Sequence, residues 1–162
     1  MQCRSSPTGP TRSRISCFTE THLINRRDAE DAEDMDVNSL TGSIIGAAIE
    51  VHKTLGPGLL EGVYEECLCH ELASRDIGFS RQYNLPIRYK GVYLECGHRI
   101  DILVENRIVL ELKAVEKLTL LHEAQLLSYL RSGCWDIGFL INFNVPVLKQ
   151  GIKRKVLNLH QH

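Results

Sequence analysis

The stretch HRIDILVENRIVLELK, residues His98 to Lys113, decides the fold of this chain. Asn106 lies at the centre of a predicted turn, and Asp101 and Glu111 stand at equal distances on either side of it. Antiparallel pairing about that turn sets the two carboxylates opposite one another on one face, with Cβ atoms about 5 Å apart. Lys113 lies two residues beyond Glu111 and therefore points to the same face. The sequence predicts a β-hairpin that carries two carboxylates and a lysine together.

The apolar residues of this stretch alternate with the charged ones, which fixes the register of the hairpin. We expect the apolar side chains to fill the opposite face, because a one-residue slip would bury the charges in the core. The residues concerned are Ile100, Ile102, Val104, Ile108, Leu110 and Leu112.

Two carboxylates that face each other on an apolar sheet repel, and they lose hydration when they are covered. A divalent cation relieves both problems, and Mg²⁺ is commonly held by one or two carboxylates together with water and phosphate oxygens. A neighbouring lysine, Lys113 here, can position a metal-bound water and offset charge that develops on a phosphate. The pattern indicates metal-assisted phosphodiester hydrolysis. The alternative is a solvated cross-strand cluster in which Lys113 only pairs with Glu111.

Apolar periodicity and turn residues divide the rest of the chain into helices and strands. A helix is expected over 38–55, capped by Asn38 or Ser39 and ended by Gly56-Pro57-Gly58. Pro86 favours an edge position for its strand. The other expected elements are a helix over about 59–75, strands Gln82–Tyr89, Val92–Val104 and Arg107–Val115, a helix over about 119–132, a strand Trp135–Phe143, and a strand or short helix Val147–Leu159. The order α-α-β-β-β-α-β predicts an α/β fold with a mixed central sheet flanked by helices.

Composition narrows the class of protein. The 162 residues suit one domain with a hydrophobic core, and the formal net charge is −1. A protein that coats nucleic acid usually has a basic pI, so any nucleic-acid contact is expected to be local. No apolar run reaches the about 20 residues that span a bilayer, and no secretory signal is visible, which indicates a cytoplasmic protein without membrane partners. The six cysteines match no common zinc spacing and are expected as reduced thiols.

Residues 1–34 differ from the rest of the chain. Ser, Thr, Pro, Gly and Arg dominate their first part, and an acidic stretch, residues 28–34, closes them. Their weak apolar periodicity predicts a disordered tail or an upstream extension of the reading frame, followed by a folded domain over 35–162. A targeting arm is the other interpretation, which the acidic stretch disfavours.

Two further pairs of polar residues accompany the carboxylates. Glu61 and Tyr64 are three residues apart, and Gln125 and Tyr129 are four apart, so each pair shares one face of its expected helix. Taken singly, Glu61 fits an acid in a first helical turn, and Gln125 fits a solvated polar stripe. The core face of the helix over about 119–132 is expected to be Leu121, Ala124, Leu127 and Leu130.

These residues together resemble a known family. The pattern of Glu61, Asp101, Glu111-Leu112-Lys113 and Gln125 with Tyr129 is similar to that of the PD-(D/E)XK nuclease superfamily, in its recombination-exonuclease-like branch. More narrowly, Gly58-xx-Glu61-xx-Tyr64 resembles the signature of the GxxExxY protein family. The likeness runs from about Met35 to Leu159.

The resemblance implies a restriction-endonuclease-like fold and a Mg²⁺-dependent nuclease, with Mn²⁺ as a substitute, that cleaves nucleic acid, DNA rather than RNA. It implies that Asp101, Glu111 and the Leu112 carbonyl bind the metal, and that Glu61 is a further acid beside it. Lys113 would be the catalytic lysine. Gln125 and Tyr129 would orient the site or contact the phosphate backbone. A non-cleaving nucleic-acid or protein binding module on the same fold is the alternative. Because no separate specificity domain is visible, a targeting protein or a homo-oligomer is expected to supply targeting.

Other candidates lie near this pattern. Arg99 is two residues before Asp101, so it is expected to touch phosphate or to form a salt bridge within the site. Tyr64 is the second residue expected to contact nucleic acid. His122 is the histidine with the best claim, because it precedes Gln125 by three residues. The basic group Lys149–Lys155 is interpreted as a solvated edge or a contact to the nucleic-acid backbone.

Overall fold

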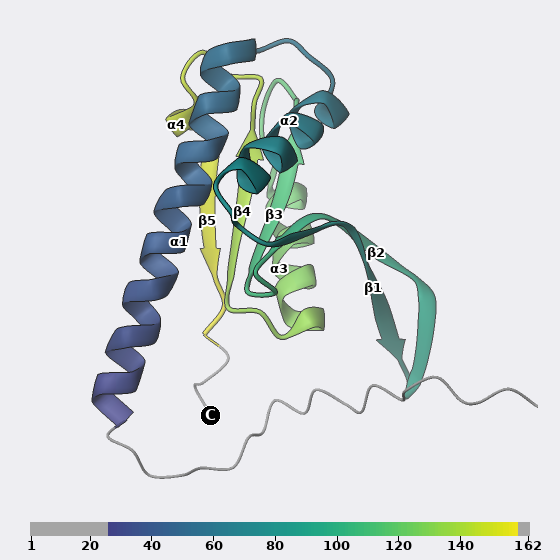
Figure 1. Cartoon of the computed structure of the whole chain (residues 1–162). Coiled ribbons are helices and arrows are strands. Elements are labelled where there is room, and N and C mark those ends of the chain that lie inside the picture. Colours follow the sequence, from purple (N-terminus) through teal and green to yellow (C-terminus); the bar gives the residue numbers. More distant parts are fainter. Residues whose placement is uncertain (1–25, 159–162) are drawn as a thin grey trace, which may run out of the picture.

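The computed structural model describes residues 26–158, which form a five-stranded sheet with helices on both faces (Figure 1). The strands lie in the order β1-β2-β3-β4-β5. The elements are α1 (Arg26–Leu55), α2 (Glu61–Ser74), β1 (Phe79–Tyr89), β2 (Val92–Val104), β3 (Ile108–Lys113), α3 (Leu120–Gly133), β4 (Ile137–Asn142), α4 (Leu148–Gly151) and β5 (Ile152–Val156). The predicted order is confirmed through β4, and the last segment, expected as a strand or a short helix, forms both α4 and β5.

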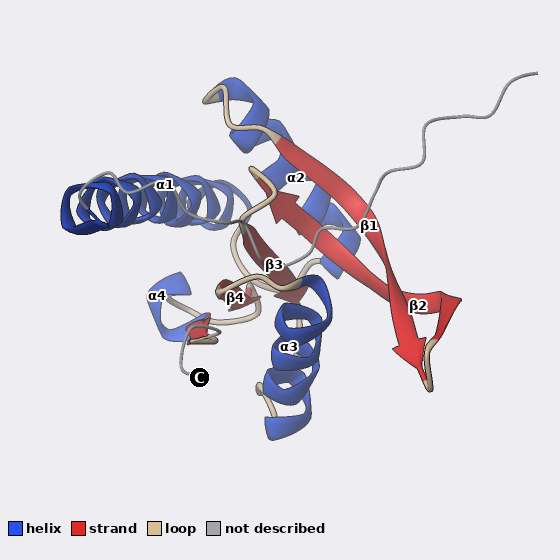
Figure 2. Ribbon diagram, turned by 90° about the horizontal axis from the view of Figure 1, so that it is seen from below, coloured by secondary structure: helices blue, strands red, loops and turns tan. Residues whose placement is uncertain are grey.

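The sheet is mixed, as the sequence predicts. β3 and β4 pair in parallel through the crossover helix α3, whereas every other neighbouring pair is antiparallel. Helices α1 and α2 pack on one face of the sheet, and α3 packs on the other (Figure 2). The strand that contains Pro86 is an edge strand, as expected. No helix among residues 26–158 is long and apolar enough to cross a membrane.

Helix α1 begins earlier than predicted. It starts at Arg26 rather than at Asn38 or Ser39, so the acidic stretch 28–34 is helical instead of unstructured. The physical reason is that acidic residues near a helix N-terminus are stabilised by the helix dipole. Residues 1–25 of the proposed tail lie outside the described residues. The predicted apolar stripe of α1 does face the core, through Ile44, Ala47, Ala48 and Val51.

The turn between β2 and β3 has the predicted centre. Glu105 and Asn106 have φ values of 48° and 54°, and the Arg107 N–H donates to the Val104 carbonyl at 2.9 Å. Positive φ at both central residues is what a type I′ hairpin turn requires. The ladder then pairs Val104 with Ile108 and continues to Ile102 with Leu110. One further step of this register places Asp101 opposite Glu111.

The expectation that Ile100 and Ile102 share a face is wrong. Ile102 packs in the core under α1 and α2, whereas Ile100 packs in the core under α3. The cause is a break in the pairing of β1 with β2. The ladder passes from Arg81–Ile102 to Tyr83–Ile100 without a pair between Gln82 and Asp101, and Gln82 has φ 50°.

Helix α3 presents to the sheet a stripe rotated from the predicted one: Leu127 and Leu130 pack against the core as predicted, but Ala124 is exposed. Leu126, Tyr129 and Leu130 are buried, whereas Leu121 is 75% exposed. The helix packs closely because Gly138 of β4 has no side chain, and an added Cβ there would lie 2.7 Å from the Leu126 Cδ1 atom. The predicted stripe is therefore rotated toward Tyr129, which turns that ring inward.

Candidate functional site

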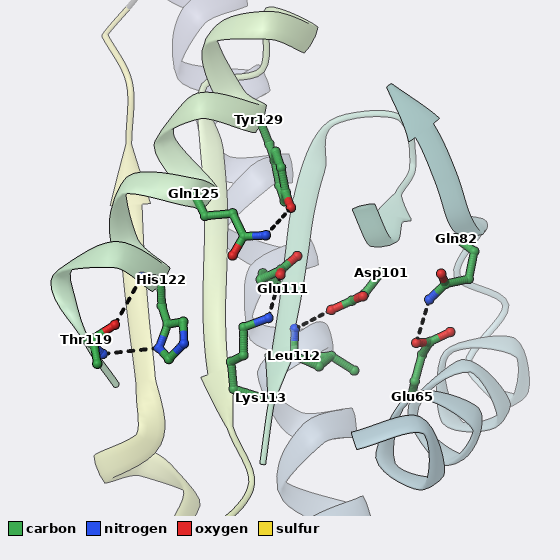
Figure 3. Close-up of polar contacts among 10 residues, drawn as sticks. All are labelled: Glu65, Gln82, Asp101, Glu111, Leu112, Lys113, Thr119, His122, Gln125 and Tyr129. Atoms are coloured by element: carbon green, nitrogen blue, oxygen red, sulfur yellow. Dashed lines mark hydrogen bonds and ion pairs between the residues drawn. The ribbon is translucent and has the colours of Figure 1, made fainter. Parts of the chain in front are cut away.

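The hairpin brings Asp101, Glu111 and Lys113 together at the middle of the sheet (Figure 3). The Lys113 Nζ donates to Glu111 Oε1 at 2.7 Å, and the Glu111 side chain is only 3% exposed. This ion pair is the contact that the alternative of a simple charge cluster predicts. A solvated cluster is excluded, however, because both partners lie largely out of water.

Asp101 is held where the two strands separate. Its Oδ2 accepts a hydrogen bond from the Leu112 N–H at 2.8 Å, beyond the last paired residues of the ladder. The carboxylate therefore replaces a backbone acceptor on β2. On the other edge of β3, the Lys113 carbonyl accepts from the Phe143 N–H at 2.8 Å. Carbonyls of successive strand residues point to opposite edges, so the Leu112 carbonyl faces the side of Asp101.

The surroundings of both acids make each of them harder to ionise than an exposed carboxyl group. Burial raises the pKa of Asp101 to about 6, against the opposing effects of the Leu112 N–H and Lys113. Burial and the charge of Asp101 raise the pKa of Glu111 to about 7. Burial lowers the pKa of Lys113, but the ion pair with Glu111 and the nearby acids outweigh it, so the net shift is upward. Two acids that are costly to ionise lie next to a firmly protonated lysine.

Glu61 joins the site from α2, of which it is the first residue. It is half-buried, and its negative charge raises the pKa values of Asp101, Glu111 and Lys113. The loop before it makes this position possible, because Gly58 has φ 102°, a conformation that strongly favours glycine.

A residue that the sequence analysis missed lies one turn further along α2. Glu65 is 6% exposed, and it accepts hydrogen bonds from Arg81 and, at 2.7 Å, from the Gln82 amide. Its charge also raises the pKa of Asp101. The available signal was its spacing of four residues from Glu61, which puts both acids on one helix face. Glu65 connects α2 to β1 at the unpaired position opposite Asp101.

Gln125 and Tyr129 lie on the α3 side of the site. The Gln125 amide donates to the Tyr129 hydroxyl, and Figure 3 shows both groups directed toward Glu111. The ring of Tyr129 is 2% exposed and lies 4.7 Å from the His98 ring. Burial and the charge of Glu111 raise the pKa of Tyr129, which keeps its hydroxyl protonated. This geometry suits positioning of Glu111 better than contact with a phosphate.

The expected contact of Tyr64 with nucleic acid is not supported. Tyr64 is fully buried, stacks on Phe143 at 4.5 Å, and donates through its hydroxyl to the Gly56 carbonyl at 2.6 Å. The same hydroxyl accepts from the Leu59 N–H at 3.1 Å. Tyr64 therefore anchors the loop that leads to Glu61.

The structure also places three other candidates. Arg99 is exposed, and no ion pair of residues 36–158 includes it, so the expected salt bridge is not formed. His122 caps α3 by accepting from the Thr119 N–H at 3.1 Å. In the basic group Lys149–Lys155, two lysines pair with Glu123, which supports the solvated edge.

Asn142 is a second residue that sequence reasoning missed. It ends β4 beside Lys113, is 2% exposed, and donates to the Val115 carbonyl at 2.8 Å. Its Oδ1 accepts from the Val115 N–H at 3.1 Å. It therefore holds the chain that leaves the site. A polar residue at the end of an apolar strand was the available signal.

The donor set fits a divalent cation of the magnesium type. The buried Glu111 Oε2 has no hydrogen-bond partner among the described residues, and a buried carboxylate oxygen of this kind is costly unless a cation or donor meets it. No three acidic, thiol or imidazole side chains of residues 36–158 are close enough to hold a metal alone. Mg²⁺ needs only one or two carboxylates, because waters and phosphate oxygens complete its octahedron.

Comparison with known proteins agrees with this geometry. Residues 38–155 match the family described as the PD-(D/E)XK nuclease superfamily. The chain matches no curated protein and no solved structure. The mixed sheet with flanking helices is consistent with the restriction-endonuclease-like fold. Since the matched residues span most of the 162-residue chain and include every acid of the site, the chain belongs to the PD-(D/E)XK nuclease superfamily.

Proposed function

We propose that this protein is a Mg²⁺-dependent nuclease that hydrolyses phosphodiester bonds in nucleic acid, with DNA as the substrate. The observation that carries the proposal is the buried Glu111 Oε2, which lacks a partner beside a second buried carboxylate and an ion-paired lysine. Superfamily membership supports it, because the matched residues include all of these side chains. The narrower likeness to the GxxExxY family remains a resemblance.

The metal would be held by Asp101, Glu111 and the Leu112 carbonyl. A bound Mg²⁺ would lower the pKa of a water and neutralise charge on the phosphate. Asp101 and Glu111 would be ionised by its presence, since the cation offsets the burial that raises both pKa values. Glu61 faces the same region from α2 and would either hold a water bound to the metal or be a further ligand itself.

Lys113 would act on the reacting groups directly. Its ammonium is paired with Glu111 Oε1 at 2.7 Å, and its side chain is 13% exposed, so it is not fully enclosed in the core. From there it can orient the attacking water and stabilise negative charge on the phosphate. Gln125 and Tyr129 would keep the Glu111 carboxylate in place from the α3 side.

Targeting is proposed to depend on a partner protein or on a second copy of the chain. The single domain over residues 38–155 accounts for nearly all the described residues, and its charge is close to neutral. Sequence-specific recognition of DNA usually needs a basic surface aimed at a groove. The isolated chain is therefore expected to cleave with little sequence preference.

The test is cleavage of labelled single-stranded and double-stranded DNA and RNA with Mg²⁺, Mn²⁺ or EDTA, with Glu111→Gln as the variant. Glu116→Gln is the matched control, because Glu116 is exposed and lies outside the site. Metal-dependent cleavage by the wild type and the control, absent from Glu111→Gln, supports the proposal and identifies the substrate class. Folded protein that binds nucleic acid but cleaves none of the four substrates would instead support the non-cleaving module.

A further inference from the structure

The strands β1 and β2 continue past the helices as a two-stranded hairpin, which Figures 1 and 2 show projecting from the layered body. We call residues 86–95 the hairpin arm. Every residue in it is exposed except the half-buried Ile87. The arm thus has almost no core of its own, and large side chains on it are available to a partner.

The arm concentrates exposed aromatic surface. The five tyrosines of the chain divide into two buried ones, Tyr64 and Tyr129, and three exposed ones that all lie on β1 or β2. Tyr93 is the most exposed of these, at 69%. Exposed aromatic rings are the platforms on which unpaired bases stack.

The arm also carries two cations that form no ion pair with a carboxylate in the part of the chain that the structure describes. Arg88 lies directly opposite Tyr93 in the register, with its guanidinium carbon 5.9 Å from the ring centroid. Lys90 lies at the tip, 5.4 Å from the Tyr89 ring. Neither cation belongs to an ion pair of residues 36–158, whereas Arg75, Arg81, Arg107, Lys153 and Lys155 all do. Unpaired positive charges beside aromatic rings suit nucleic acid, because the charges attract phosphates and the rings stack on bases.

One face of the arm has a hollow of a suitable size. A pocket of about 450 Å³ is lined by Asn84, Pro86, Tyr93 and Glu95. The ring supplies a stacking surface, and the amide and carboxylate can hydrogen-bond to the edge of a base. Tyr89 pairs with Val92 at the adjacent register position, so its side chain lies on the opposite face of the ribbon.

We propose that the hairpin arm binds an unpaired, single-stranded segment of nucleic acid, with a base stacked on Tyr93 at the pocket and Arg88 at a neighbouring phosphate. Duplex bases are already stacked and do not offer their faces to such a platform, which favours a single strand. The proposal rests on the proposed function, since it names the form of nucleic acid that the nuclease holds. The proposed stacking contact lies apart from the proposed catalytic site. Tyr93 precedes Asp101 by eight residues of the same strand, which is a distance of at most about 26 Å.

The test measures binding of the full chain to a fluorescent single-stranded oligonucleotide and to its duplex, in EDTA so that nothing is cleaved. The variants are Tyr93→Ala and Tyr93→Phe, and Tyr89→Ala is the matched control on the opposite face. We expect Tyr93→Ala to weaken single-strand binding about 5-fold to 100-fold, Tyr93→Phe to restore it, and Tyr89→Ala and duplex binding to change less than twofold. Arg88→Gln is expected to reduce the salt dependence of single-strand binding by about one phosphate contact.

Equal affinities of all variants for the single strand would overturn the inference, as would equal losses for single strand and duplex. The cleavage assay separates this failure from failure of the proposed function. If the wild type cleaves with metal and Tyr93→Ala cleaves with unchanged KM, the nuclease stands and the arm is not its binding element. If no substrate is cleaved but Tyr93→Ala still loses single-strand affinity, the arm stands and the nuclease fails.

Discussion

Glu111 is the side chain on which the proposed chemistry depends most. It is buried, one of its oxygens is paired with Lys113, and the other has no partner among residues 36–158. Such an arrangement destabilises the ionised acid, and the raised pKa reflects that cost. A metal-binding site accepts the cost because the cation, when bound, supplies the missing partner.

This cost predicts a pH dependence of stability for the metal-free protein. The pKa of Glu111 rises from 4.5 to about 7, and that of Asp101 from 3.8 to about 6. A raised carboxyl pKa in the folded state stabilises the fold below the unfolded pKa, and this contribution is lost as pH rises through about 4 to 7. We expect the free energy of unfolding in EDTA to fall from pH 5 to pH 8. The fall should be greater in the wild type than in Glu111→Gln, by an amount on the order of 2–3 kcal/mol.

Thermal unfolding at both pH values measures this difference, and Mg²⁺ added at pH 8 should raise the Tm of the wild type more than that of Glu111→Gln. The same pH dependence in both proteins would mean that Glu111 is not a strained acid.

Tyr64→Phe tests whether that tyrosine is an anchor or a substrate contact. The change removes the hydrogen bonds of the hydroxyl with the Gly56 carbonyl and the Leu59 N–H, which are part-buried, so we expect a loss of about 0.5–1.5 kcal/mol per bond in the free energy of unfolding. The KM for nucleic acid should stay the same. Tyr83→Phe is the control, because Tyr83 is 37% exposed, and its stability should change little. An increased KM with unchanged stability would restore the nucleic-acid role.

Sequence reasoning worked well for some side chains and poorly for others. Asp101, Glu111 and Lys113 could be placed because strand alternation and a turn centre are local properties. The contacts of Glu65 with Arg81 and Gln82 join a helix to a strand 16 to 17 residues away, so they depend on packing that no local pattern encodes. The burial of Tyr64 depends on Phe143 in the same way.

The start of α2 is the element that delivers Glu61 to the site. The chain turns between α1 and α2 through Gly58 at φ 102°, and Glu61 follows as the first helical residue. The loop before Glu61 is also held in place by the Tyr64 hydroxyl, which accepts from the Leu59 N–H and donates to the Gly56 carbonyl. Geometry before the helix is therefore as important to the site as the acid itself.

The two glycines of this motif should respond in opposite directions. Gly58→Ala places a Cβ on a backbone with positive φ, so we expect a loss of more than about 1 kcal/mol in stability and weaker cleavage. Gly62→Ala lies inside α2 with nothing within 4 Å of the added Cβ, so it should gain about 0.5–1 kcal/mol. Urea unfolding and cleavage rates of both variants check this. Equal effects of the two substitutions would show that the loop does not position Glu61.

Elements were predicted better than their faces. β2 has the predicted bounds, and β3, α3 and β4 lie within two residues of theirs. The face of α3 was wrong because Gly138 lets Leu126 approach the sheet, a property of two elements together. The register shift between Leu85 and Ile87 was equally invisible, since it accompanies Gly97, where an added Cβ would lie 1.9 Å from the Leu85 carbonyl oxygen.

The charge of the whole chain predicts a modest affinity for nucleic acid. Its formal net charge is −1, and several exposed cations are already paired with carboxylates. We therefore expect few phosphate contacts, on the order of 2–4, and a slope of log affinity against log salt of about −2 to −4. Binding titrations at salt concentrations from about 50 to about 200 mM measure this slope. A slope steeper than about −6 would reveal a basic surface that the fold does not display.

The class of fold follows from the order of the elements, so it could be predicted from the sequence, whereas the chemistry inferred from one hairpin stays a prediction. The hairpin arm could not be predicted, because its exposure depends on where the helices end. The strands themselves were predicted, but only the packed structure places their tips outside both cores.

The most direct test of the account is Lys113→Ala measured for cleavage and for metal binding in the same preparation. Lys117→Ala is the matched control, because Lys117 is exposed four residues further along the chain. We expect Lys113→Ala to lose cleavage by at least about 100-fold while Mn²⁺ binding persists, and Lys117→Ala to keep both. Cleavage by Lys113→Ala at the rate of the wild type would contradict the central claim that Asp101, Glu111 and Lys113 form the catalytic site.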